Sequence, residues 1–150
     1  ASASKQTIYK WWPSIGAMCV DAALALIPNA PEGGRDPQER ITALIVPLEA
    51  AARTGNGHAV LRGALSAAAD DKEAGEAWRA WMNRDIRQPM RMVLVELAAK
   101  RVIRRDFDLD EVVEQLLGPL FHRICVMRAP VREGFCAYQA FIALRVYSSI

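Results

Sequence analysis

The chain has 150 residues, of which 52% are hydrophobic and 24% charged, and this length and composition suit one domain with a real core. Its net charge of +2 is too small to indicate a nucleic-acid partner by itself. The chain has three cysteines and no Cys-x-x-Cys pair, which argues against a disulfide framework or a zinc knuckle. It has no apolar run of membrane-spanning length and no signal-peptide pattern, and this predicts a cytoplasmic protein without membrane contact.

The first fourteen residues contain a short predicted helix that carries most of the functional signal. The hydroxyl of Ser4 is suited to cap its N-terminus, and Pro13 ends it just before Ser14, which is suited to cap the next helix. Ile8 and Trp11 lie three residues apart and are expected to bury. Hydrogen-bond donors occupy the other side: Lys5, Gln6, Thr7, Tyr9 and Lys10. This division of faces is typical of a recognition helix in a DNA major groove.

The rest of the chain shows helix signals and almost no strand signals, which predicts an all-α bundle. The clearest helix start is Asp36, because proline follows it at the first helical position and Glu39 can reach back to the cap. Residues 28–34 form the clearest loop. Helices are expected over Ser14–Ile27, from Asp36 to a break at Gly55–Gly57, around Leu61–Ala68, from Asp70 to about Arg105, from Asp108, and after Pro130.

Residues 4–14, Ser-Lys-Gln-Thr-Ile-Tyr-Lys-Trp-Trp-Pro-Ser, resemble the recognition helix and following turn of TetR-type (TetR/AcrR) transcriptional regulators. The Gly-Pro-Leu-Phe step at 118–121 resembles one in a C-terminal domain subfamily. The resemblance implies two further helices before the recognition helix, although the sequence starts within the motif. It also implies that residues 1–27 end a DNA-binding helix-turn-helix domain and that 36–150 form a helical domain for ligand binding and dimerisation.

The resemblance implies a homodimer that binds a roughly palindromic double-stranded operator, as a repressor rather than an activator. We expect Lys5 and Gln6 to contact base edges. Ser4, Thr7, Tyr9 and Lys10 complete the expected DNA-binding set, the last three as phosphate contacts. Of the two tryptophans at 11 and 12, one is expected to pack beneath the helix and the other to rest on the DNA backbone. The family's usual phosphate-binding lysine is Ile15 here, which favours the alternative of a helical binding protein that has lost sequence-specific DNA binding.

Pro47, Pro89 and Pro119 fall inside predicted helices, where each removes a backbone donor and is expected to bend the helix and leave space beside it. The resemblance implies a pocket for a small-molecule effector in this domain, and Trp and Met side chains suit an apolar or aromatic molecule. The expected pocket residues are Trp78, Trp81, Met82, Met90, Phe121, His122 and Cys125. The open alternative is that these side chains only fill the core.

The last two predicted helices are apolar over much of their circumference, so each needs burial on more than one side. Two such helices facing a second copy would form a four-helix interface, as the resembling family does. The expected interface residues are Leu117, Phe121, Ile124, Tyr138, Phe141 and Leu144. The alternative is that both helices lie at the centre of the bundle.

An enzymatic function is the least expected class. His122 and Cys125 are three residues apart and could meet on one helix face, but the sequence around them supplies no orienting group. The two histidines and three cysteines show no metal-ligand spacing. We therefore expect no catalytic residue, no metal and no cofactor.

Overall fold

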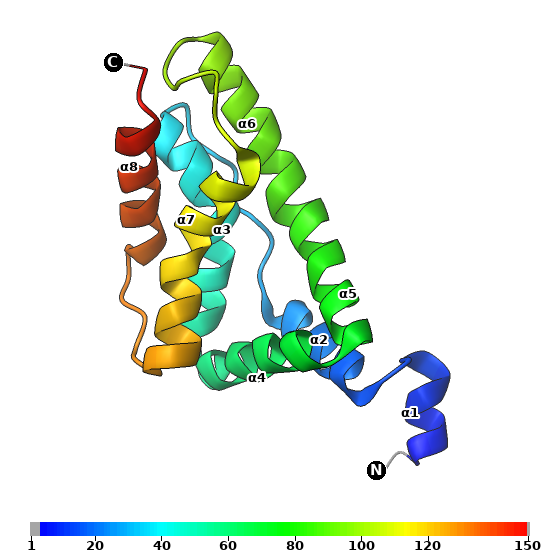
Figure 1. Ribbon diagram of the computed structural model, residues 1–150. Helices are drawn as coiled ribbons and strands as arrows, with labels where there is room; N and C mark the ends of the chain where they lie inside the picture. The colour runs from blue at the N-terminus through cyan, green and yellow to red at the C-terminus, as the bar shows by residue number, and fades with distance from the viewer. Residues whose placement is uncertain (1–3, 150) are drawn as a thin grey trace.

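The computed structural model describes residues 4–149, and its regular secondary structure is helical (Figure 1). No strand occurs among these residues, and one isolated bridge pairs Ile103 with Ser148. The predicted all-α fold is therefore confirmed. The elements are α1 (Lys5–Trp11), α2 (Ile15–Leu26), α3 (Pro37–Arg53), α4 (Gly57–Asp70), α5 (Lys72–Trp81), the π-helical turn η1 (Met82–Arg87), α6 (Gln88–Ala99), α7 (Leu109–Phe121), the π-helical turn η2 (His122–Met127) and α8 (Phe135–Tyr147).

The expected capping residues begin their helices. The hydroxyl oxygens of Ser4 and Ser14 each accept a hydrogen bond from the backbone N–H three residues later, at 3.3 and 3.0 Å. Asp36 and Asp108 each accept from two backbone N–H groups of the first turn. Each cap lies close in sequence to its donors, and this is why local patterns predict the helix starts well.

Asp71 joins the starts of two helices. Its Oδ1 caps α5 by accepting from the N–H of Ala74 (2.7 Å), and it also accepts from the hydroxyl of Ser14 at the start of α2 (2.9 Å). Gly16 allows this close approach, because a Cβ at that position would lie 2.9 Å from the Asp71 carboxyl carbon. The start of α2 is therefore fixed on α5.

Two long helices each contain a π-helical turn close to a proline. At the end of η1 the N–H of Gln88 donates to the carbonyl of Asn83, five residues back, and Pro89 follows directly. The second turn, η2, begins three residues after Pro119. Proline lacks an N–H and its ring crowds the preceding turn, and the widened turn η1, which comes directly before Pro89, relieves this crowding. Pro47 lies within α3 without such a turn.

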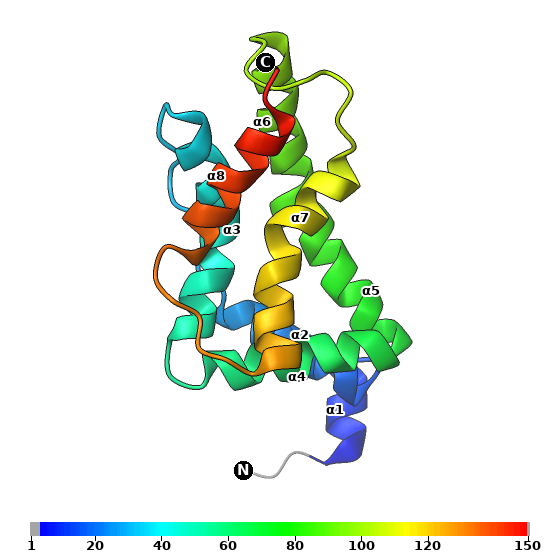
Figure 2. The same ribbon diagram turned by 60° about the vertical axis from the view of Figure 1, so that its left-hand side comes forward.

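The body of the molecule has three long helical legs, formed by α3, by α7 and by the continuous run α5–η1–α6, with α4 crossing their lower ends (Figure 1). Helix α8 packs on α3 and α7, and Figure 2 shows it in front of α3. Helix α2 packs on α4 and α5. One cluster of buried apolar side chains unites α2 to α8. In both views α1 projects below this body, and none of its residues is buried.

Glu49 attaches α8 to α3. Its side chain is 4% exposed, and its two carboxylate oxygens accept from the N–H groups of Gly134 and Cys136, both at 2.8 Å. Gly134 begins α8 with a φ of 80° and has no side chain to cap it, so Glu49 supplies the cap from another helix. Burial, and secondarily the Glu49 carboxylate, raise the pKa of the Cys136 thiol to about 12. That thiol therefore stays protonated and donates to the carbonyl of Ile45 (3.6 Å).

A partly exposed ion-pair group joins α3 to α6. Arg40 and Lys100 each donate to one carboxylate oxygen of Glu96, both at 2.6 Å. The hydrogen bonds from Arg40 and then Lys100 lower the pKa of Glu96 from 4.5 to about 2. Because the folded state holds this carboxylate ionised, its contribution to stability is complete above about pH 4.5 and is lost as the pH falls toward 2.

We expect Glu96→Gln to flatten the acid dependence of stability. The thermal midpoint of the variant should fall less than that of the wild type as the pH is lowered through this range, since the variant has no carboxylate to protonate. Glu114→Gln, an exposed change on α7, serves as the control and should keep the wild-type pH dependence. Equal slopes for Glu96→Gln and the wild type would show that the ion-pair group contributes nothing.

Candidate nucleic-acid interface and ligand pocket

Helix α1 presents all of the predicted DNA-binding side chains to solvent. Ser4, Lys5, Gln6, Thr7, Tyr9 and Lys10 are exposed. The hydroxyls of Ser4 and Thr7 lie 2.9 Å apart and form a local hydrogen bond at the helix start. The two lysines are the charged residues of α1, which has no acidic side chain. A short projecting helix with cationic and neutral donors is chemically suited to enter a DNA groove.

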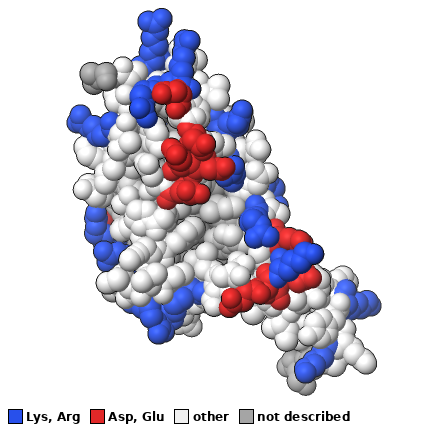
Figure 3. Space-filling model, in the orientation of Figure 1, with Lys and Arg blue, Asp and Glu red and all other residues white. Residues whose placement is uncertain are grey.

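On the face shown in Figure 3, the surface charge of α1 differs from that of the neighbouring body. Figure 3 shows only Lys and Arg among the charged side chains of the projecting helix, whereas acidic side chains, with some basic ones, gather on the part of the body next to it. Phosphate groups are attracted by the first surface and repelled by carboxylates on the second. On this face the charge therefore favours DNA contact at α1.

The two tryptophans after Tyr9 have different environments. Trp11 is 70% exposed and the Lys10 ammonium lies 5.6 Å from its ring centre, so the expected burial of Trp11 is not observed among residues 4–149. Trp12 is half-buried, and its indole Nε1 donates to the Asp21 carboxylate of α2 at 3.1 Å. Ile8 is half-buried and Ile15 is exposed. Trp12 is therefore the tryptophan that attaches the end of α1 to the body.

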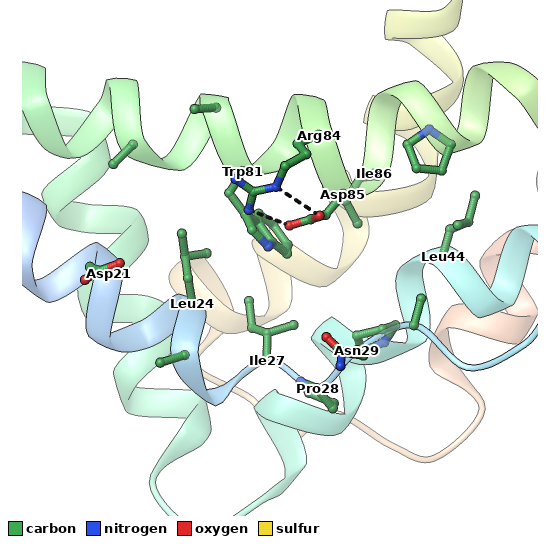
Figure 4. A pocket seen from close by; sticks show the side chains of 16 residues that line it. Asp21, Leu24, Ile27, Pro28, Asn29, Leu44, Trp81, Arg84, Asp85 and Ile86 are labelled. Carbon is green, nitrogen blue, oxygen red and sulfur yellow. Dashed lines mark hydrogen bonds and ion pairs between the residues drawn. The ribbon is translucent and has the colours of Figure 1, made fainter.

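A pocket of about 650 Å³ lies between α2, α3 and the α5–η1–α6 run. Figure 4 shows Leu24, Ile27 and Pro28 on one side and Trp81 on the helix opposite. The polar lining residues are Asp21, Asn29, Arg84 and Asp85, and the remaining lining residues are Ala25, Ala30, Leu44, Pro47, Ala77, Ala80, Ile86 and Pro89. Most lining residues are apolar, although polar and apolar atoms share the accessible wall almost equally, and such a wall suits a small organic molecule that also carries a polar group. Pro47 and Pro89, two of the prolines expected to leave space, both line it.

The structure brings only one of the seven predicted pocket residues, Trp81, to this pocket. Trp78 is buried behind it, with ring centres 5.3 Å from Trp81 and 6.1 Å from Phe121, so these rings support the pocket from within the core. Met90 is fully buried and Met82 packs against the core. For these residues the alternative of core packing applies.

His122 and Cys125 lie elsewhere. His122 is exposed, and Cys125 lines a second cavity, of about 710 Å³, together with Arg62 and Arg128. Both residues belong to η2, where the wider π-helical turn separates residues three apart more than an α-helix does. Burial raises the pKa of the Cys125 thiol, with Arg62 opposing, so the reactive thiolate is disfavoured. Within residues 4–149 no group of His, Cys, Asp and Glu residues is arranged to hold a metal ion.

The predicted interface residues divide between surface and core. Tyr138 and Phe141 are 50% and 41% exposed on α8, with stacked rings 6.4 Å apart, while Phe121 and Leu144 are half-buried. The predicted place in the dimer interface is wrong for Leu117 and Ile124, because both are fully buried within the subunit. The broad apolar stripe of α7 and η2 thus faces inward at these two residues. The exposed apolar surface of α8, which we call the α8 face, consists of Tyr138, Phe141, Ile142 and Val146.

Sequence reasoning missed the pocket residues of α2 and the loop that follows it, above all Asp21, Leu24, Ile27 and Asn29. The Trp and Met side chains lie mainly on the long helix, whereas the pocket wall depends on how α2 packs against that helix. The proline at 28, which ends α2 beside the loop, was the available signal. No helix among residues 4–149 is long and apolar enough to cross a membrane.

Comparison with known proteins identifies the family. Residues 31–139 match the family model described as the Tetracyclin repressor-like, C-terminal domain. The chain is 24% identical over 139 residues to the HTH-type transcriptional regulator YdeS of Bacillus subtilis (strain 168), covering 90% of this chain and 69% of that protein. The crystal structure of the TetR family transcription regulator SCO0332 aligns with a TM-score of 0.68 and 27% identity, over 100% of this chain and 82% of that one. The all-α fold, the projecting helix α1 and these matches together show that the chain belongs to the TetR-type family of transcriptional regulators.

Proposed function

We propose that this regulator is a cytoplasmic repressor that binds operator DNA through α1 as a homodimer and is released by a small, largely apolar or aromatic molecule in the pocket beside α2. The observation that carries the proposal is that α2 connects the two sites. It lines the pocket with Asp21, Leu24 and Ala25, and only three residues separate its start from the end of α1. The match over residues 31–139 supports a ligand-binding and dimerisation domain over 36–150. Residues 1–27 then form the end of the DNA-binding domain.

The proposed release depends on the spacing of two α1 helices. A dimer that reads successive major grooves holds its recognition helices about 34 Å apart, one turn of DNA. A ligand that fits the pocket better when α2 is displaced favours a different spacing and lowers operator affinity. A ligand that binds both arrangements equally releases nothing. Dimerisation through the α8 face would place the two pockets in equivalent positions.

Substitutions in α1 test the DNA-binding role. We expect Lys10→Ala to reduce the slope of log affinity against log salt by about one, because one phosphate contact is lost. We expect Gln6→Ala to weaken operator binding about tenfold without changing that slope, because it removes a contact to a base edge. Both are measured on operator DNA across a salt series, with protein that carries the complete helix-turn-helix that the family implies.

Lys100→Ala is the matched control, since it removes the same charge at the far end of α6 from α1 (Figure 1). It should leave both affinity and slope close to the wild-type values. If Lys10→Ala and Gln6→Ala behaved like Lys100→Ala, α1 would not be the surface that binds DNA.

A further inference from the structure

We infer that Asp21 couples the pocket to α1, and that the effector is a flat apolar molecule with a positive charge, which competes with Trp12 for this carboxylate. The inference rests on the proposed function and specifies both the ligand class and the residue that transmits its binding. Two features of the structure support it, the contact between Trp12 and Asp21 and the charge of the pocket, and Asp21 belongs to both.

The first feature is the attachment of α1. Trp12 ends α1, with its backbone N–H donating to the carbonyl of Ile8 (3.0 Å), while its indole Nε1 donates to Asp21 (3.1 Å). Among residues 4–149, this is the sole hydrogen bond from residues 4–12 to the body. The contact between Ser14 and Asp71 lies beyond Pro13 and fixes α2, so it does not orient α1. The Trp12–Asp21 bond therefore links the end of α1 directly to a residue of α2 that lines the pocket.

The second feature is the charge of the pocket. Arg84 donates to both carboxylate oxygens of Asp85, at 3.2 and 2.9 Å, so these two charges neutralise each other. Asp21 forms no ion pair with any Lys or Arg among residues 4–149. With two carboxylates and one guanidinium among its lining residues, the pocket has a net formal charge of −1. Figure 4 shows Asp21 on α2 and Trp81 on the helix opposite, and an indole ring attracts cations.

Because of these two features, the ligand binds with different affinity to the states with and without the Trp12–Asp21 bond, as a ligand-controlled switch requires. A cation held between Trp81 and Asp21 takes the carboxylate that the Trp12 indole otherwise uses. The ligand then binds better when the Trp12–Asp21 bond is broken, and α1 loses this contact with α2. Because Asp21 is exposed to water, its attraction for a cation is moderate, and a preference of about fivefold over a neutral ligand is expected.

The test compares N-methylquinolinium, a flat cation, with neutral quinoline at mildly alkaline pH, on the intact dimer with and without operator DNA. The wild type should bind the cation about fivefold more tightly than quinoline. Asp21→Asn should abolish this preference, because the amide keeps an acceptor oxygen but loses the charge. Asp70→Asn removes an exposed carboxylate outside the pocket and should keep the preference. Equal binding of both probes by the wild type, or a preference retained in Asp21→Asn, would overturn the ligand class.

Trp12→Phe tests the coupling. It removes the indole N–H and frees Asp21, so operator affinity should already be reduced without ligand. The cation should bind more tightly than to the wild type and should not reduce operator affinity further. A full cation-induced loss of operator binding in Trp12→Phe would overturn the role of Asp21. Both results differ from those expected if the proposed function is wrong. In that case the wild-type dimer would not bind its operator in the absence of ligand, or neither probe would change operator binding.

Discussion

Phe141→Asp is expected to give a monomer that binds operator DNA about a hundredfold or more weakly than the wild type. Phe141 lies in the middle of the α8 face, and the Arg145 guanidinium lies 5.3 Å from its ring centre. In a two-fold dimer each substitution occurs twice, and it replaces an apolar contact by a carboxylate that must lose its water to be buried, even where Arg145 can pair with it. A dimer binds both half-sites at once, and a monomer loses the gain in affinity from the second site.

Sedimentation equilibrium gives the mass, and titration with operator DNA gives the affinity. Val95→Asp is the matched control, because Val95 is also an exposed apolar residue but lies on α6, outside the α8 face. It should remain dimeric and bind DNA as the wild type does. A dimeric Phe141→Asp variant with unchanged operator binding would show that the α8 face is not the interface.

Glu49→Ala is expected to produce the largest loss of stability, about 3 to 5 kcal/mol. The substitution removes two hydrogen bonds to a buried carboxylate and leaves the N–H groups of Gly134 and Cys136 without their acceptor. It also separates the start of α8 from α3. For a chain of this size, the thermal midpoint should fall by about 10 °C.

Two further variants complete the test of the Glu49 cap, one a partial loss and the other an exposed control. Glu49→Gln keeps one acceptor oxygen and should have intermediate stability. Glu114→Ala is an exposed change and should alter the free energy of unfolding by no more than about 0.5 kcal/mol. Denaturant unfolding measures all three variants. A loss for Glu49→Ala as small as that for Glu114→Ala would mean that α8 does not depend on this cap.

The sequence predicts the helices well because the signals that begin and end them are local. Ser4, Ser14, Asp36 and Asp108 each bond to backbone groups within three residues, so the pattern itself contains the interaction. The resemblance of residues 4–14 predicts the recognition helix for the same reason. Helical periodicity shows that a face is apolar, but it does not show whether a core, a ligand or a second subunit covers that face. Leu117, which is buried in the core, shows this limit.

The contacts that sequence reasoning missed join residues far apart in the chain. Glu49 caps a helix that begins 86 residues later, at Phe135, and Asp71 bonds to Ser14 across 57 positions. The pocket likewise depends on α2 facing the long helix. Trp81 was predicted from its residue type, whereas Asp21 is an ordinary surface carboxylate until the fold places it between the pocket and Trp12.

The proposed function is tested most directly by binding of the complete dimer to its own promoter region across a salt series. The predicted result is a dimer bound with a dissociation constant of about 10 nM or tighter, and a steep fall of log affinity with log salt, because several phosphates are neutralised. Weak binding without preference for that region would contradict the function. The chain would then be a helical small-molecule-binding dimer that has lost sequence-specific DNA binding, as Ile15 in place of the family's usual lysine allows.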